Sequence, residues 1–342
     1  MNLNKFWKTS LFLIILSLIL IGSPLLAQNS KNGKDILKLS LDAQSRVDFE
    51  GIRKIQTYTS NRIYSFVAKV IYQKPNFIYV EYLYPPEVKG RIIIDDGKKR
   101  IEYLPGIDKK IKILPSLNCS WIKEKRERAL KIMLINFNIS KIFEEKILGR
   151  KTYVLSLSPK NLIGPFLKLW IDEKTHLVLR KEKYNSEREP ISVLRYTKVN
   201  FNKHFSKKEF YNKLPIIPSI SKRFPLPSSY TLQEIKARAN FPLSFPGYLP
   251  PGYIFQEGEI MVKRKIVKLV YTNGLEVIVL FQRPSAKIAM GHHKWKRFDN
   301  PRIRFREGPY GKTLVWDRKK KTFVLMGEVP LGELIKIAQS IK

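Results

Sequence analysis

The chain has 342 residues, of which 44% are hydrophobic, and this fraction excludes a wholly disordered protein. Its 64 Lys and Arg against 29 Asp and Glu give a formal net charge of +35, which in a cytosolic protein would first suggest nucleic acid. The basic residues are spread along the whole chain, however, and no single basic arm or helix stands out.

The N-terminus has the three parts of a secretory signal. Lys5 and Lys8 precede an apolar run from Leu11 to Ile21, and Gly22-Ser23-Pro24 then breaks any helix. A small residue, Ala27, stands at the expected cleavage position. We therefore expect a signal peptide that is cleaved after this alanine, with a retained membrane anchor as the alternative.

Export directs the interpretation of the charge away from nucleic acid. It places the mature chain in the periplasm or another extracytoplasmic part of the cell envelope, where a basic surface can meet anionic lipid headgroups or an acidic partner. The other interpretation is a compositional bias towards Lys that produces an ordinary solvated surface.

The first domain is expected over residues 28–212 and should consist mostly of antiparallel strands. A short helix is predicted at Ile36–Ala43 and a second at Trp121–Ile135. Asp96-Gly97 between two β-type runs indicates a hairpin whose turn positions both need φ > 0. The predicted strands are Phe49–Thr59, Ile63–Tyr72, Asn76–Tyr84, Arg91–Asp95, Lys99–Leu104, Phe137–Ile147, Lys151–Ser158, Phe166–Asp172, Leu177–Tyr184 and Ile191–Asn200.

A proline-rich linker over residues 213–230 separates this domain from a second one at 231–342. Proline fixes φ and removes a backbone donor, so neither a helix nor a central strand can continue through the linker. Thr231 and Glu234 form a capping box at the start of a short helix, and Asn273-Gly274 marks another hairpin. An amphipathic helix with apolar positions from Leu331 to Ile341 should close the chain. The predicted fold class is therefore α+β.

Motifs for catalysis or metal binding are absent from the sequence. His292 and His293 are neighbours without the spacing of a metal site, while His176 and His204 stand apart. Cys119 is the single cysteine, so no internal disulfide can form. We expect no catalytic residues, no metal and no cofactor, and hence no enzyme.

Bulky aromatic side chains are abundant on the predicted strands of the first domain. An ordinary core explains any one of them, but a strongly curved sheet closed by helices can also enclose an apolar cavity for an acyl chain. The candidate cavity residues are Phe66, Tyr72, Phe77, Tyr79, Tyr82, Tyr103 and Trp170.

Several passages resemble known families. Asn136–Pro159 is similar to the strand, turn and strand of LolA-like proteins, and Leu169–Glu182 is similar to their next hairpin. Phe245–Tyr253, Leu269–Leu275 and Val324–Gly327 resemble the C-terminal domain of the sigma-E regulatory proteins RseB and MucB. The order of these passages along the chain is that of the RseB/MucB family.

The resemblance implies a curved antiparallel half-barrel closed by helices, followed by a smaller domain of antiparallel sheet and helix. It also implies a periplasmic regulator that senses lipid-like envelope-stress ligands and binds the periplasmic segment of an anti-sigma factor to control its proteolysis. The alternative, based on the first domain alone, is a LolA-type carrier of lipid or lipoprotein. Acyl lipid is an expected ligand, nucleic acid is not an expected partner, and peripheral contact with an anionic membrane is compatible with the charge.

Overall fold

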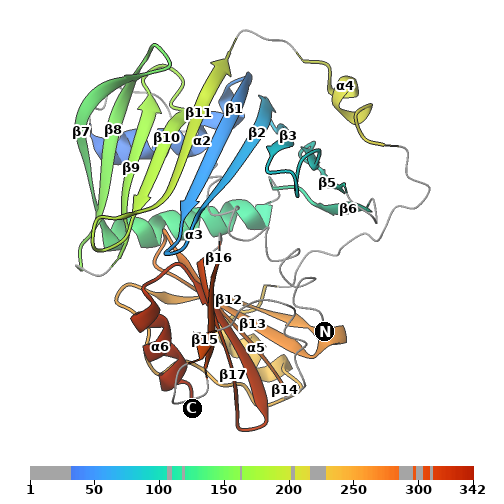
Figure 1. Cartoon of the computed structure of the whole chain (residues 1–342), viewed down its shortest axis with the longest axis vertical. Coiled ribbons are helices and arrows are strands. Elements are labelled where there is room, and N and C mark those ends of the chain that lie inside the picture. The colour runs from blue at the N-terminus through green and yellow to red at the C-terminus, as the bar shows by residue number, and fades with distance from the viewer. Residues whose placement is uncertain are drawn as a thin grey trace.

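The structure is a computed structural model that describes residues 32–105, 110–117, 120–161, 164–201, 205–215, 229–284, 296–297, 303–308 and 311–342. The predicted signal peptide lies outside these ranges, as do Cys119, His204, His292, His293 and most of the predicted linker. Two antiparallel sheets, one above the other in Figure 1, make up the described part of the chain.

The first sheet has eleven strands in the order β6-β5-β4-β3-β2-β1-β11-β10-β9-β8-β7. Every pair of neighbours is antiparallel, and β1 pairs with β11, which joins the two halves of the sheet. The strands are β1 (Phe49–Tyr58), β2 (Ile63–Gln73), β3 (Phe77–Tyr84), β4 (Ile92–Asp95), β5 (Lys99–Leu104), β6 (Lys110–Pro115), β7 (Phe137–Ile147), β8 (Arg150–Pro159), β9 (Phe166–Asp172), β10 (Val178–Tyr184) and β11 (Pro190–Asn200).

Irregularities in strand pairing bend this sheet without closing it. Register shifts occur at Ile52/Arg53 in β1, Val67/Ala68 in β2 and Lys141/Phe143 in β7. Such bulges increase the local twist and curve a sheet. The predicted α+β class and the open, curved first sheet are both confirmed.

Helices α2 (Gly33–Arg46) and α3 (Ser120–Asn136) cover one face of the first sheet, which we call the inner face. Leu37 of α2 and Met133 of α3 pack into one buried cluster with Leu155 and Leu157 of β8. In Figure 1, α3 runs along the lower edge of the first sheet, directly above the second sheet. Helix α3 therefore has neighbours on both sides.

The other face of the sheet is covered beside β3 by a short helix that the sequence did not suggest, α4 (Lys207–Tyr211). Phe210 of this helix lies 4.7 Å from the ring centroid of Tyr79 and 5.7 Å from that of Phe77. This cover explains why β3 is apolar on both faces.

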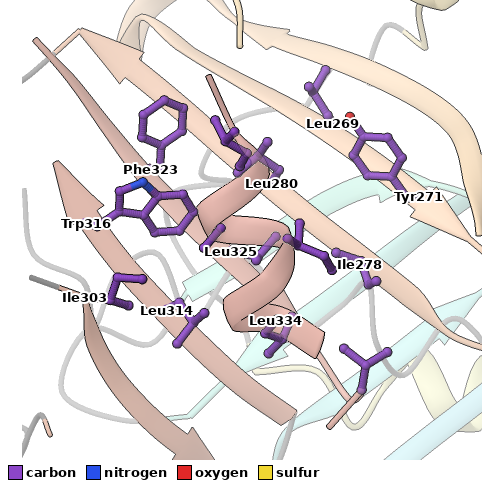
Figure 2. Packing of buried hydrophobic residues seen from close by; sticks show 14 of the residues in the cluster. Leu269, Tyr271, Ile278, Leu280, Ile303, Leu314, Trp316, Phe323, Leu325 and Leu334 are labelled. Atoms are coloured by element: carbon purple, nitrogen blue, oxygen red, sulfur yellow. The ribbon is translucent and has the colours of Figure 1, made fainter. Parts of the chain in front are cut away.

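The second sheet has seven strands in the order β12-β13-β14-β18-β17-β16-β15. Its core is made of large apolar side chains such as Trp316, Phe323, Leu280 and Leu325, and α6 lies over them (Figure 2). Helix α5 (Leu232–Arg238) begins with the predicted capping box. The remaining elements are β12 (Ile254–Met261), η2 (Val262–Arg264), β13 (Ile266–Thr272), β14 (Val277–Pro284), β15 (Lys296–Arg297), β16 (Arg304–Gly308), β17 (Gly311–Arg318), β18 (Lys321–Gly327) and α6 (Leu331–Ser340).

Both Gly-containing hairpins form, but their turns differ from the expectation. Gly97 and Gly274 have φ of +87° and +92°, whereas Asp96 and Asn273 are not left-handed. Each loop is longer than two residues, so only its glycine needs positive φ. The turn with two left-handed residues is instead Lys319-Lys320 between β17 and β18, with φ of +48° and +57°.

Candidate functional site

The structure divides the seven predicted cavity residues between the two faces of the first sheet. Phe66, Tyr72 and Tyr82 belong to one cluster on the inner face, together with buried Tyr196 of β11. Phe49 stacks on Tyr72 with ring centroids 4.8 Å apart. These three of the seven predicted residues therefore lie in one apolar cluster.

The other four predicted residues lie elsewhere. Phe77, Tyr79 and Tyr103 pack with Phe210 on the outer face. Trp170 of β9 is buried separately: its indole N–H donates to Glu145 Oε2 at 2.6 Å, and Arg180 lies 4.5 Å from its ring centroid. The seven therefore form an inner-face group of three, an outer-face group of three and the separate Trp170, and their ligand-binding role remains a prediction.

Sequence reasoning missed the charged groups that accompany the aromatic side chains of the inner face. Arg53 of β1 forms side-chain hydrogen bonds with Tyr72 and Tyr196. Arg126 of α3 is buried and carries a second positive charge close to Tyr72. We call Arg53, Tyr72, Tyr82, Arg126 and Tyr196 the inner cluster.

The electrostatics of the inner cluster follow from burial. Burial raises the pKa of the Tyr72 and Tyr196 hydroxyls above the ordinary value of 10, although the nearby Arg53 opposes the rise at both. The tyrosines therefore stay neutral and can donate or accept hydrogen bonds, while the arginines keep their charge. Cations and hydroxyls beside Phe49 and Phe66 are suited to an apolar molecule with an anionic end.

A second group of charges connects the two sheets. Nζ of Lys183 in β10 is 2.6 Å from Oε1 of Glu276, which precedes β14, and it also contacts Glu328, which follows β18. We call Lys183, Glu276 and Glu328 the junction triad. Tyr253 donates from its hydroxyl to Oε2 of Glu276 at 2.9 Å.

The triad lies beside a lysine with an unusual pKa. Burial lowers the pKa of Lys181 to about 7, and the positive charge of Lys183 adds to the effect. Burial also disfavours the charged form of Glu328, but the attraction of Lys183 outweighs it and the pKa of this carboxyl falls. A charged Lys183 beside two carboxylates thus holds the sheets together, and Lys181 titrates close to neutral pH.

Helix α3 contacts the tip of the β13–β14 hairpin. The Asn136 side-chain amide donates to the carbonyl oxygens of Gly252 and Asn273 at 2.9 and 3.0 Å. A Cβ atom at Gly274 would lie 2.3 Å from the Met133 backbone nitrogen, closer than such atoms can approach. A glycine is therefore required where the hairpin meets the helix.

At the other end of α3, Nζ of Lys125 lies 2.5 Å from Oε2 of Glu257 in β12. Together with the amide of Asn136, this ion pair connects the helix to the second sheet at both of its ends. Helix α3 thus contributes Arg126 to the inner cluster. It also contributes Lys125 and Asn136 to the contacts with the second sheet.

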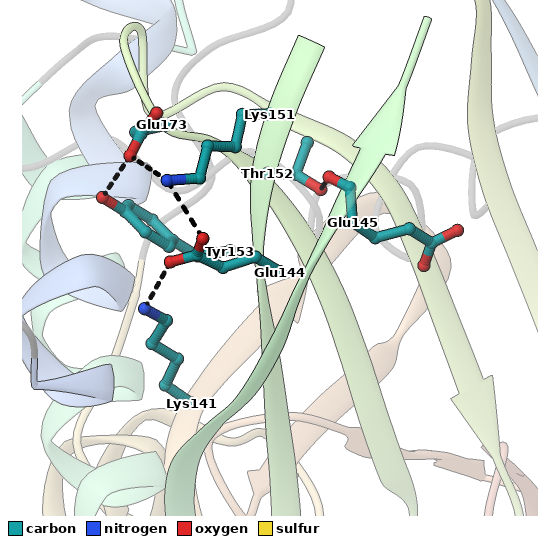
Figure 3. A network of polar contacts seen from close by, with 7 residues as sticks. All are labelled: Lys141, Glu144, Glu145, Lys151, Thr152, Tyr153 and Glu173. Carbon is teal, nitrogen blue, oxygen red and sulfur yellow. Dashed lines mark hydrogen bonds and ion pairs between the residues drawn. The ribbon is translucent and has the colours of Figure 1, made fainter. Parts of the chain in front are cut away.

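A network of ion pairs on β7 and β8 is more exposed than the junction triad (Figure 3). Nζ of Lys151 is 3.0 Å from both Glu144 and Glu173, and Lys141 pairs with Glu144 at 2.7 Å. Tyr153 donates to Glu173 at 3.1 Å. Lys151 is 49% exposed, so the network is a solvated counterpart of the junction triad.

Within the described ranges, no group of three or more His, Cys, Asp or Glu is arranged to hold a metal. His176 sits at the β9–β10 turn with φ of +57°, and burial lowers the pKa of its imidazole. Over the same part of the chain, no helix is both long and apolar enough to cross a membrane.

The fold and the site define a class: an α+β protein of two antiparallel sheets, in which the curved first sheet carries the inner cluster and α3 contacts the second sheet. The sequence model of the MucB/RseB N-terminal domain matches residues 121–214, from α3 to the end of α4. No curated protein sequence matches the chain.

Among solved structures, the chain is similar to MucB from Pseudomonas aeruginosa in its MucA/MucB complex. The TM-score is 0.60 at 14% identity, and the match covers 91% of this chain and 98% of that one. A structure of MucB in complex with MucA(peri) gives a TM-score of 0.54 at 15% identity, with the same coverage. Residues 121–214 therefore match the MucB/RseB N-terminal domain model, and the chain has the fold of MucB, as the resemblance predicted.

Proposed function

We propose that this chain is a regulatory binding protein of the cell envelope that binds the extracytoplasmic segment of an anti-sigma factor and controls its proteolysis. The observation that carries the proposal is the fold, which the chain shares with MucB over nearly the whole length of that protein; in this chain α3 contacts both sheets. Two of the solved MucB structures are complexes with MucA or MucA(peri), and the resemblance to the RseB/MucB family implies that such a partner is an anti-sigma factor. The expected export signal supports a location in the periplasm.

The stimulus in this proposal is a lipid-like molecule at the inner cluster. Its anionic end would pair with Arg53 and Arg126, and its apolar part would lie against Phe49 and Phe66. Because Arg126 belongs to α3, a ligand that pairs with this arginine also acts on the helix that contacts the second sheet. This shared helix is the physical route by which ligand binding would change the partner surface.

The test uses the soluble extracytoplasmic segment of a single-span membrane protein encoded beside a sigma factor in the same genome. Calorimetry should show a complex of defined stoichiometry, and the bound segment should be cut more slowly by protease. A folded chain that neither binds nor protects the segment would refute the proposal. Gly274→Val, which displaces the hairpin from α3, should weaken binding more than Gly149→Val, whose site is open.

The inner cluster also favours a second candidate function, that of a lipid or lipoprotein carrier. A carrier would purify with acyl lipid and pass it to an acceptor membrane without needing the anti-sigma segment. Native mass spectrometry of the wild type and of Arg53→Met distinguishes the two functions. Lipid transfer combined with no segment binding would select the carrier, whereas segment binding that is altered by added lipid selects the regulator.

A further inference from the structure

The end of the second sheet farthest from α3 carries a dense group of basic residues. β13 and β18 run from this end towards the junction, ending at Thr272 and Gly327. Because β13 has seven residues, its two ends are about 20 Å apart. The residues of this basic end are Lys263, Arg264, Lys265, Arg283, Arg318, Lys319, Lys320 and Lys321.

Strand register places the two basic turns at the same level. Ile266 starts β13, Val267 pairs with Gln282, and Pro284 pairs with Lys321. The β12–β13 and β17–β18 turns thus project from one edge, with β14 between the two hairpins. At a strand spacing of about 4.8 Å, the turns are about 15 Å apart, so a flat surface can touch both.

The backbone of these turns shows that lysine is not there for ease of folding. Lys319 and Lys320 form the β17–β18 turn with both residues left-handed, a conformation that favours Asn-Gly, and Lys265 is left-handed with φ of +50°. A non-glycine residue in the left-handed region of φ/ψ space adds backbone strain. Three lysines in unfavourable conformations at one end indicate that their charge is useful.

Apolar surface accompanies the charge. Val262, directly before Lys263, is 73% exposed at the tip of the β12–β13 turn. The nearby 240–245 segment holds an open hollow of about 560 Å³ lined by Phe241, Leu243 and Phe245. Lys321 ties this segment to the basic end, since its Nζ donates to the carbonyl oxygen of Pro242 at 3.1 Å. The end therefore combines exposed cations with apolar groups.

We propose that the basic end docks on an anionic membrane surface, with its lysines and arginines against lipid phosphates and Val262 in the headgroup region. Clustered lysines and arginines are attracted to anionic lipid headgroups, each contributing about 1 kcal/mol near the surface. Asp317 is the neighbouring carboxylate, but it accepts a hydrogen bond from Thr322 and pairs with Arg304 at 3.7 Å. Docking here leaves the junction triad at the opposite end of the strands, away from the bilayer, and it does not depend on an anti-sigma partner.

Vesicle flotation tests this proposal with protein purified as the host exports it. The wild type should float with phosphatidylcholine vesicles that contain phosphatidylglycerol and should stay in solution with phosphatidylcholine alone. The pair Lys319→Asn with Lys320→Gly should lower partitioning about 25-fold, at about five-fold for each lysine near the surface. The same pair creates a favoured Asn-Gly turn, so its melting temperature should stay equal or rise, which separates loss of docking from loss of folding.

The matched control removes the same charge from the first sheet with Lys146→Gln and Lys198→Gln, both on exposed strand positions. If the control loses as much partitioning as the turn pair, net charge and not the basic end is responsible, and the proposal fails. It also fails if the turn variant floats like the wild type, or if the wild type prefers DNA to vesicles at the same salt concentration. Val262→Ser should add a further loss that high salt does not reproduce.

Discussion

The two sheets bury different kinds of groups against their helices. In the second sheet, α6 closes over apolar side chains such as Leu280, Trp316 and Leu325, all with at most 1% exposure. In the first sheet, the face beneath α2 and α3 includes Arg53, α3 adds the buried Arg126, and Lys183 of β10 is buried as well. The face of the second sheet beneath α6 is built mainly of apolar side chains, although Lys268 and Glu257 are buried elsewhere in that sheet, whereas the inner face of the first sheet holds charged groups.

This contrast indicates where a substitution should cost the most stability. Buried ionic groups contribute little net stability compared with apolar residues of similar volume, but removing one partner leaves the other charge uncompensated. The inner cluster and the junction triad are therefore sensitive places, and the apolar second sheet is the frame against which they are positioned. Four substitutions test this division.

Lys183→Met should have the largest effect. It leaves Glu276 and Glu328 buried or half-buried without their cation, and breaking such a pair costs about 3–5 kcal/mol in the free energy of unfolding. Urea titration at neutral pH measures the loss. Adding Glu276→Gln and Glu328→Gln should recover most of it, and a loss that the added changes do not recover would show that the lysine acts through packing alone.

Gly274→Val should separate the two domains. Its Cβ would lie 2.6 Å from the Ala129 carbonyl oxygen as well as against Met133, and its φ is left-handed, so we expect a loss of about 2–4 kcal/mol. Calorimetry should resolve two melting transitions in the variant. Gly149→Val shares the left-handed φ but has nothing within 4 Å of its Cβ; equal losses in the two variants would mean that the contact with α3 does not join the domains.

Lys181→Met should remove a pH dependence. Burial disfavours the charged form of Lys181 and lowers its pKa to about 7, so the unfolded chain binds more protons between pH 7 and 10. The stability of the wild type should therefore rise with pH across this window, by about 1 kcal/mol per pH unit, relative to the variant. Lys198→Met, at an exposed position, serves as the control. Parallel stability curves for the wild type and Lys181→Met would contradict the assigned pKa.

Lys151→Met should have the smallest effect, although Lys151 makes as many ion pairs as Lys183 does. Its partner Glu144 is exposed and its partner Glu173 is half-exposed, and water and salt screen such pairs (Figure 3). The melting temperature should match that of the wild type in high salt. A fall comparable to that of Lys183→Met would remove the distinction between exposed and buried ionic groups.

The sequence predicted most strands of the fold because alternation and turn residues are local signals. Strand β3 shows the limit of such local signals. Its apolar residues on both faces can be read from the sequence, but Phe210, which covers one face, lies more than 120 residues further along the chain. Helix α3 was located from its pattern, yet its contacts with both sheets depend on Asn136 reaching Asn273.

The candidate site was predicted only in part, for the same reason. Bulky aromatic residues are conspicuous in a sequence, but the face on which each lies depends on strand register, which separates Tyr72 from Tyr79. Arg53 could have been found by following the alternation from Phe49, since both occupy inward positions of β1. Lys183 could not, because its partners belong to a sheet formed nearly a hundred residues later.

The contact between α3 and the β13–β14 hairpin has a consequence for biosynthesis. Asn136 and its acceptor Asn273 are separated by 137 residues, so α3 must wait for most of the second domain to be made before its outer side is covered. During synthesis and export, the first sheet can assemble while that side of the helix still faces solvent. In a chain that stops before the hairpin, this side of α3 would stay exposed. Proteases and chaperones could then recognise the incomplete molecule by that surface.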